Sequence, residues 1–125
     1  MLFMLIVKAS HNSEAGNLPS AELREAMSKY NEELIQAGVR IMAKGLHPSS
    51  NGLRLSFPKP GEEPVVTEGP FAASPDLVAG FFLIDVKSKE EAVEWAKRMP
   101  DPQGHGEGQI ELRQVFESPS DLTEV

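Results

Sequence analysis

Two strand-length segments without a polar face constrain the fold of this chain most strongly. Residues 2–8 read LFMLIVK and residues 80–86 read GFFLIDV, so each segment is apolar at consecutive positions. Because the side chains of a strand alternate between the two faces of a sheet, such runs predict strands that are covered on both faces. The first run is shorter than the roughly 20 residues of a membrane-spanning helix and lacks the basic residues of a signal peptide, so we interpret it as a buried strand.

Two other segments carry the signals of amphipathic helices. In residues 20–37, apolar side chains recur three or four positions apart, and Ser20 is placed to cap the first turn. In residues 88–99, the sequence SKEE predicts a capping box, in which Ser88 accepts a hydrogen bond from the backbone of Glu91 and the Glu91 carboxylate reaches back. The sequence therefore predicts two helices.

The remaining segments predict shorter strands and loops. The turn PKPGEE joins two short apolar segments into a hairpin. The strand candidates are 39–47, 53–57, 64–68 and 109–116, and the predicted loops are 11–19 and 101–108.

The order of these elements predicts the architecture. We expect one domain over residues 1–117, followed by a C-terminal tail over residues 118–125. The predicted order is strand, helix, strand, hairpin, strand, helix and strand. This order is typical of an α+β fold of ferredoxin-like sandwich type, in which an antiparallel sheet carries two helices on one face. The other face would expose a large apolar patch, which soluble monomers rarely show. A second copy packing sheet against sheet would bury that patch, so we predict a homodimer.

The charge and composition of the chain limit its partners. With 12 Lys and Arg against 19 Asp and Glu, the net charge is -7, which repels nucleic-acid phosphates and anionic membrane surfaces. We therefore expect neither a nucleic-acid nor a membrane partner. The sequence has no cysteine, which excludes disulfides, thiolate metal ligands and a cysteine nucleophile and suits a cytoplasmic location.

No motif predicts a metal or an organic cofactor. Asp101, His105 and Glu107, with His11 as a fourth residue, match no known metal-binding spacing. The segment GHGEG does not match the dinucleotide-binding pattern, and the sequence has no phosphate-binding loop. We expect no cofactor and no metal, and the roles of His11 and His105 stay open.

The sequence EGPF at residues 68–71 is the strongest candidate for a site. Its glycine and proline make a stiff corner after a strand. The structural interpretation is a turn in which Phe71 fills an apolar gap. The functional interpretation is that the corner holds the Glu68 carboxylate at the mouth of a cavity, where burial would raise its pKa toward the range useful for proton transfer. His47, at the end of a strand, is the other acid/base candidate, and its structural alternative is a ring hydrogen-bonded to the adjoining turn.

Charged residues on the last strand form a second candidate. Glu111 and Arg113 share one face of the strand, opposite Ile110 and Leu112. If the apolar pair faces the helices, the charged pair points between the two sheets of a dimer, where the two can form an interface salt bridge. The functional alternative is that Arg113 anchors a carboxylate or phenolate ligand, with Lys8 beside it.

Taken together, these segments resemble one known family. The chain resembles the YCII-related family, specifically its DGPF-type members, in the segments GLHPSS, EGPFAAS, GFFLIDVKSKEEAVEWAKRMPDP and EGQIELRQVFE. The resemblance covers nearly the whole chain. It implies a dimeric α/β barrel built from ferredoxin-like subunits. The acid that begins the family's motif is usually aspartate and is Glu68 here, which keeps the charge with a longer reach.

The resemblance leaves two classes of function open. Some DGPF-type domains resemble parts found alongside extracytoplasmic sigma factors, whereas relatives in the wider group look like small-ring lyases or dehalogenases that work without a bound cofactor. Our leading hypothesis is a homodimer that binds a small anionic or aromatic metabolite and performs cofactor-independent acid/base chemistry. The alternative is a non-catalytic regulatory or protein-interaction module. In the first hypothesis the acid/base groups are His47 or Glu68, and the ligand-binding groups are Phe71, Arg113 and Lys8.

Overall fold

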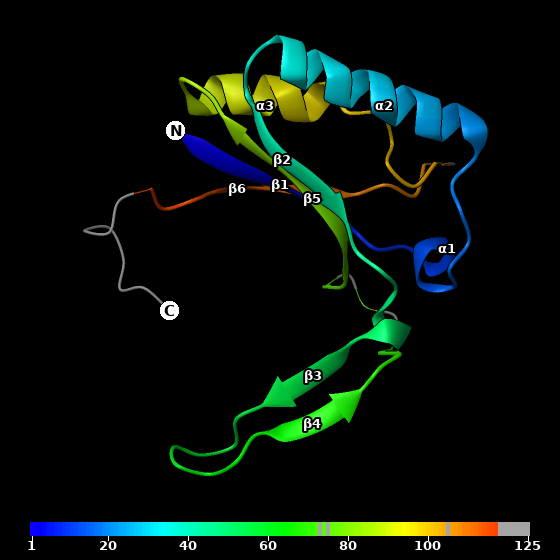
Figure 1. Cartoon of the computed structure of the whole chain (residues 1–125), viewed down its shortest axis with the longest axis vertical. Coiled ribbons are helices and arrows are strands. Elements are labelled where there is room, and N and C mark those ends of the chain that lie inside the picture. The colour runs from blue at the N-terminus through cyan, green and yellow to red at the C-terminus, as the bar shows by residue number, and fades with distance from the viewer. Residues whose placement is uncertain (73, 75, 105, 118–125) are drawn as a thin grey trace.

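A four-stranded antiparallel sheet forms the centre of the protein. The structure, a computed structural model, describes residues 1–72, 74, 76–104 and 106–117. Two helices lie on one face of the sheet, which confirms the predicted α+β architecture of ferredoxin-like type (Figure 1). In spatial order the strands are β2 (Arg40–Gly45), β5 (Val78–Asp85), β1 (Leu2–Lys8) and β6 (Ile110–Gln114), and the two helices are α2 (Ala21–Gln36) and α3 (Lys89–Arg98).

The segment after β1 differs from its sequence prediction. The sequence predicts a loop over residues 11–19, and this is wrong for the first four of them, which form the short helix α1 (His11–Glu14). Ser10 caps this helix, and its side chain accepts a hydrogen bond from the Ser13 backbone while the Ser13 hydroxyl lies 2.8 Å from the Ser10 nitrogen. A four-residue helix has no room for an apolar repeat, so hydrophobic periodicity cannot detect it.

The core lies between the sheet and its two helices. Phe3, Leu5 and Val7 of β1 are buried on this face, and Tyr30 of α2 packs edge-on against Phe82 of β5 with ring centroids 5.6 Å apart. The Tyr30 hydroxyl donates to the backbone carbonyl of Trp95 at 2.7 Å. Since Met99 donates to Ala96 instead of Trp95, this hydroxyl satisfies a carbonyl that the end of α3 leaves unpaired.

Replacing Tyr30 by phenylalanine is expected to lower the free energy of unfolding by about 1 to 3 kcal/mol, because the Trp95 carbonyl then stays buried without a partner. Burial raises the pKa of Tyr30 from 10.0 to about 12. Between pH 10 and pH 12 the folded protein therefore keeps the phenolic proton of Tyr30, whereas the unfolded chain loses it. Stability consequently falls as pH rises from 10 to 12. Urea unfolding at several pH values measures both effects. An equal alkaline loss in Y30F and wild type would contradict the assignment to Tyr30, the only tyrosine of the chain.

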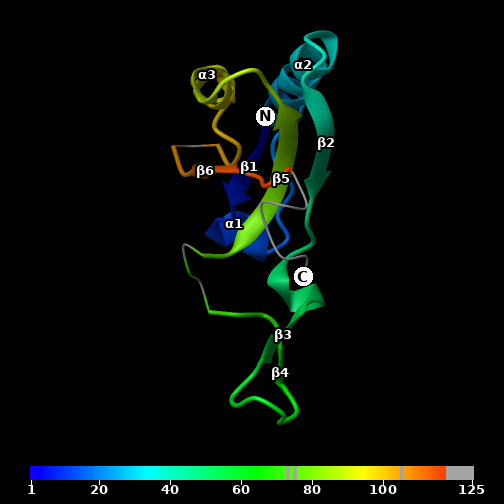
Figure 2. The ribbon, with the colours of Figure 1, turned by 90° about the vertical axis from the view of Figure 1, so that its left-hand side faces the viewer.

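The other face of the sheet carries apolar side chains at its centre. Across β1 and β5, Ile6 lies opposite Phe81 and Met4 lies opposite Leu83, and all four are partly exposed. We call these four residues the open face. In the part of the chain that the structure describes, both long helices lie on the opposite side (Figure 2).

The predicted hairpin stands apart from the sheet. β3 (Leu53–Ser56) and β4 (Val65–Glu68) pair only with each other, and they project beyond the end of the four-stranded sheet as an arm (Figures 1 and 2). A one-turn 3₁₀ helix, Ser49–Asn51, lies at the base of the arm.

No helix in the described ranges is long and apolar enough to cross a membrane. The predicted tail, residues 118–125, lies outside the described residues.

Candidate functional site

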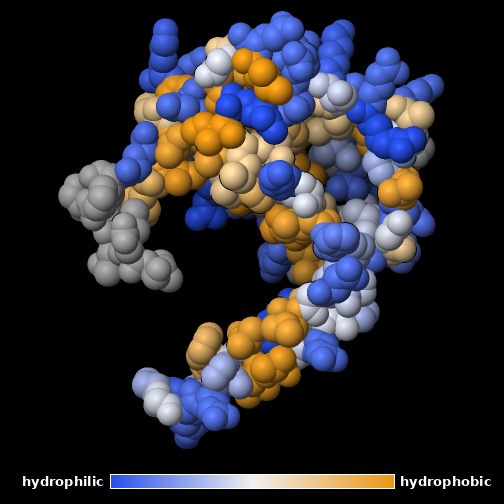
Figure 3. Space-filling model, in the orientation of Figure 1, coloured by the Kyte–Doolittle hydropathy of each residue, from blue (hydrophilic) through white to orange (hydrophobic). Residues whose placement is uncertain are grey.

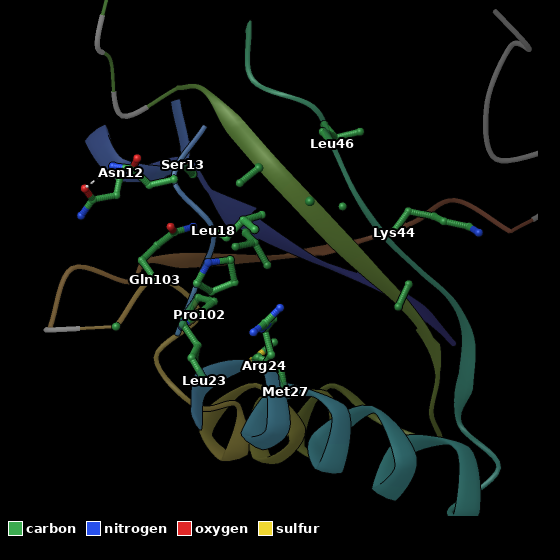
Figure 4. Close-up of a pocket in the computed structure, with 18 of the residues that line it drawn as sticks. Asn12, Ser13, Leu18, Leu23, Arg24, Met27, Lys44, Leu46, Pro102 and Gln103 are labelled. Carbon is green, nitrogen blue, oxygen red and sulfur yellow. Dashed lines mark hydrogen bonds between the residues drawn. The ribbon is translucent and has the colours of Figure 1, made fainter. Parts of the chain in front are cut away.

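A cleft of about 680 Å³ opens between α2 and the end of the sheet. Figure 4 shows its walls, which come from the segment before α2, from α2 itself, from the end of β2 and from the loop after α3. We call it the α2 cleft. A volume of this size suits a small organic molecule. The apolar side chains on its walls include Leu18, Leu23, Met27, Leu46 and Pro102.

One cationic group enters this apolar space. The Arg24 side chain extends from α2 into the cleft, whereas Lys44, which also borders the cleft, points away from it (Figure 4). Arg24 makes no salt bridge with any residue in the described ranges. An arginine fork in a mostly apolar cleft matches a carboxylate or another planar anion.

Another polar side chain borders the cleft two turns further along α2. Asn31 lines the cleft, and its amide oxygen is buried without a hydrogen-bond partner among the described residues. Asn31 lies seven positions after Arg24 on the helix, which corresponds to roughly 10 Å along the helix axis. The cleft therefore offers an anion-binding group and an amide at separate positions.

The loop after α3 is fixed in place as one wall of the cleft. The Gln103 amide nitrogen donates to the Lys8 carbonyl at 3.0 Å, and the Ser10 hydroxyl donates to the Gln103 amide oxygen at 2.9 Å. Within the loop, the Asp101 carboxylate accepts from the backbone of Gln103 and Gly104, both at 3.0 Å. Asp101 thus uses its carboxylate for backbone hydrogen bonds that shape the loop. His105 of the same loop lies outside the described residues.

Replacing Asp101 by asparagine is expected to lower the melting temperature at pH 7. Burial acts to raise the pKa of Asp101, but hydrogen bonds from four backbone groups of the loop outweigh it and hold this pKa below its ordinary value of 3.8. The carboxylate therefore stabilises the fold above about pH 4, and this contribution is lost as pH falls through the lowered pKa. The gap in melting temperature between wild type and D101N should shrink below pH 4. Asp76→Asn, at an exposed position, is the control, and a gap independent of pH would contradict this role.

The Gly-Pro-Phe corner packs against the 3₁₀ helix at the base of the arm. The Gly69 nitrogen donates to the Gly52 carbonyl at 2.9 Å, and the Phe71 nitrogen donates to the Ser49 hydroxyl at 3.0 Å. Ser49 in turn donates through its backbone to the Glu14 carboxylate at 2.9 Å, and its hydroxyl donates to the same carboxylate. Helix α1, the 3₁₀ helix and the corner are thus joined through one serine.

This arrangement borders a second cavity of about 650 Å³, which we call the corner cleft. Its walls include His11 and Glu14 of α1 and Phe71 of the corner. The guanidinium of Arg54 stacks over the Phe71 ring at 4.0 Å. Phe71 therefore forms part of a cavity wall, and its ligand-binding role stays a prediction. Sequence reasoning missed Glu14, because its partner Ser49 lies 35 residues away and no local pattern connects them.

The two acid/base candidates lie elsewhere. Glu68 is exposed at the end of β4, opposite Leu53, and lines neither cleft. His47 is exposed between β2 and the 3₁₀ helix, and its neighbours Leu46 and Pro48 border the α2 cleft. The structure does not bring His47, Glu68 and Phe71 together on one cavity wall. The catalytic roles of His47 and Glu68 stay predictions.

Two charged residues of the last strand pair with each other in the subunit. Arg113 forms a salt bridge with Glu111 at 3.0 Å, and the Lys8 ammonium lies 3.7 Å from the same carboxylate. The hydrogen bond from Arg113, followed by the charge of Lys8, lowers the pKa of Glu111. Glu111 lies opposite Ile6, so this cluster borders the open face and not the α2 cleft. A ligand-anchoring role for Arg113 and Lys8 stays a prediction.

Comparisons with known proteins agree with the resemblance found in the sequence. The family model of the YCII-related domain matches residues 1–118. A search of curated proteins finds no match. In the described part of the chain, no group of three or more His, Cys, Asp or Glu side chains is arranged to hold a metal ion.

Proposed function

Since this chain belongs to the YCII-related family, we propose that it is a small-molecule-binding homodimer whose α2 cleft takes a small, partly apolar anion. The observation that carries the binding proposal is the Arg24 side chain inside a mostly apolar cleft. The apolar walls favour a hydrocarbon or aromatic body, and the guanidinium favours a carboxylate at one end. The homodimer is supported by the apolar open face of the sheet.

A thermal-shift panel of small carboxylates, phenols and lactones tests the binding proposal. A carboxylate ligand is expected to raise the melting temperature of wild type, because a ligand that binds only the folded state stabilises it. Arg24→Gln should weaken binding by about 10- to 100-fold, which corresponds to the roughly 1.5 to 3 kcal/mol of a charged hydrogen bond.

Lys44→Gln is the matched control for this panel. It removes the same charge from the border of the same cleft, but its side chain points away from the cleft (Figure 4). Binding to K44Q should equal binding to wild type. Equal weakening in both variants would show that the anion responds to net charge and not to Arg24.

A cofactor-independent acid/base reaction is a second proposal, and the corner cleft supports it better than the α2 cleft. Among the described residues, the α2 cleft is lined by no carboxylate and no imidazole. The corner cleft has an imidazole, His11, beside the apolar wall of Phe71. His11 is then the acid/base group, and Glu14, which Ser49 fixes, orients α1. An NMR titration of His11 with and without a phenol ligand tests this, and an unchanged titration would reject it. The comparisons do not favour the protein-interaction alternative.

A further inference from the structure

The arm formed by β3 and β4 has one face that is apolar except for Glu68 at its end, and no other strand or helix of the described residues pairs with the arm. Leu53 pairs with Glu68, and Leu55 pairs with Val66 on the same face. Leu53, Leu55 and Val66 are 54%, 47% and 55% exposed. A two-stranded hairpin is at best marginally stable in water without further packing. The arm therefore needs a surface to cover this face.

The arm and the body of the subunit border a hollow (Figure 3). Figure 3 shows hydrophobic residues along the arm and on the underside of the body, with an open space between them. The chain exposes 8765 Å², whereas a compact monomer of 13.7 kDa exposes about 6,600 Å². The residues after Glu117 can account for at most the accessible area of an extended chain, roughly 1,200 Å². After this area is subtracted, the chain still exposes on the order of 1,000 Å² more than a compact monomer.

The size of this excess matches the area that a stable interface between two copies would bury. A stable protein interface buries about 800 Å² on each partner, and obligate dimers bury more. In a two-fold symmetric dimer each subunit offers the same surfaces to the other, so one contact covers two open faces and two arms at once. A second copy of this chain would thus cover both apolar surfaces.

We infer that the β3–β4 arm packs its Leu53, Leu55 and Val66 face on the second copy of the chain and is part of the dimer interface. This inference rests on the homodimer proposed above and adds the arm to it. The arm begins next to the corner cleft, since Arg54 stacks on Phe71.

Charge substitutions on the two faces of the arm test the inference. Leu55→Asp with Val66→Asp places two carboxylates on the apolar face, and Ser56→Asp with Thr67→Asp places two on the opposite face of the same strands. Molar mass in solution is measured by light scattering after size exclusion. We expect wild type and the S56D/T67D control to be dimers, and the L55D/V66D variant to dissociate with at least a tenfold higher dimer Kd.

The outcomes separate the two proposals. A monomeric wild type overturns the homodimer and with it the role of the arm. A dimeric wild type whose L55D/V66D variant also stays dimeric overturns only the arm. Equal dissociation of both double variants also overturns the arm, because face specificity is lost.

A cross-linking experiment covers the case in which the charged variant does not fold. The chain has no cysteine, so Leu55→Cys introduces a single thiol for a photoactivated cross-linker. A covalent dimer is expected from L55C, with a lower yield from Ser56→Cys on the opposite face. Products confined to one chain would overturn the inference.

Discussion

Replacing Gly69 by alanine is expected to destabilise the protein by about 2 to 3 kcal/mol, in the upper range for overpacking a close contact. A Cβ at this position would overlap the carbonyl oxygen of Ser49. The contact atom belongs to the backbone, so no side-chain rotation relieves the overlap. The corner must then move away from the 3₁₀ helix and lose the bonds that Gly69 and Phe71 make there. Chemical unfolding measures the loss.

Gly45→Ala is the control for this substitution. A Cβ at Gly45 would meet no atom within 4 Å, and the backbone there has no positive φ, so alanine should change stability by no more than about 0.5 kcal/mol. If G69A proves as stable as G45A, the corner is loosely held and its stiffness is not what positions Phe71. If G69A also loosens binding of a ligand at the corner cleft, the two roles of the corner are linked.

The regular elements could be predicted because their signals are local. Ser20 and Ser88 cap α2 and α3, each accepting a hydrogen bond from the backbone three residues ahead. The alternation in residues 110–114 predicts that Glu111 and Arg113 share a face, and they form a salt bridge. These predictions depend on residues that are neighbours in the chain, where periodicity and capping carry the information.

The clefts could not be predicted because their walls come from distant segments. Arg24 lies near the N-terminus of α2 and has the pattern of a solvent-exposed residue. The end of β2 and the loop around Pro102, both distant in the sequence, make a cleft beside it. The EGPF corner makes a tight backbone contact, since a Cβ on Gly69 would overlap the Ser49 carbonyl oxygen. The sequence associates the corner's function with Glu68, whereas the cavity beside it is lined by Phe71, His11 and Glu14. Local chemistry identifies a special position but not the direction in which each neighbouring side chain points.

Replacing Ile6 by aspartate is expected to raise the dimer Kd by more than about 100-fold. Ile6 lies at the centre of the open face, opposite Phe81 on one side and Glu111 on the other. In a sheet-to-sheet dimer the new carboxylate would be buried at about 3 kcal/mol or more, because the nearby cations, Lys8 and Arg113, already pair with Glu111, and its charge would add to that of Glu111. The monomer should keep its fold, because this face is partly exposed in one subunit. Sedimentation equilibrium over a range of concentrations measures Kd.

Gln114→Asp supplies the control, because it adds the same charge at an exposed position of β6. Q114D should dimerise as wild type does. If I6D keeps the wild-type Kd while the arm variant L55D/V66D dissociates, the two subunits meet through their arms and the open face is not the contact. If I6D dissociates and the arm variant does not, the sheets alone hold the dimer. Dissociation of both, with Q114D and S56D/T67D unaffected, requires an interface that includes the sheet and the arm together, because each charge then disrupts the same buried surface from a different element.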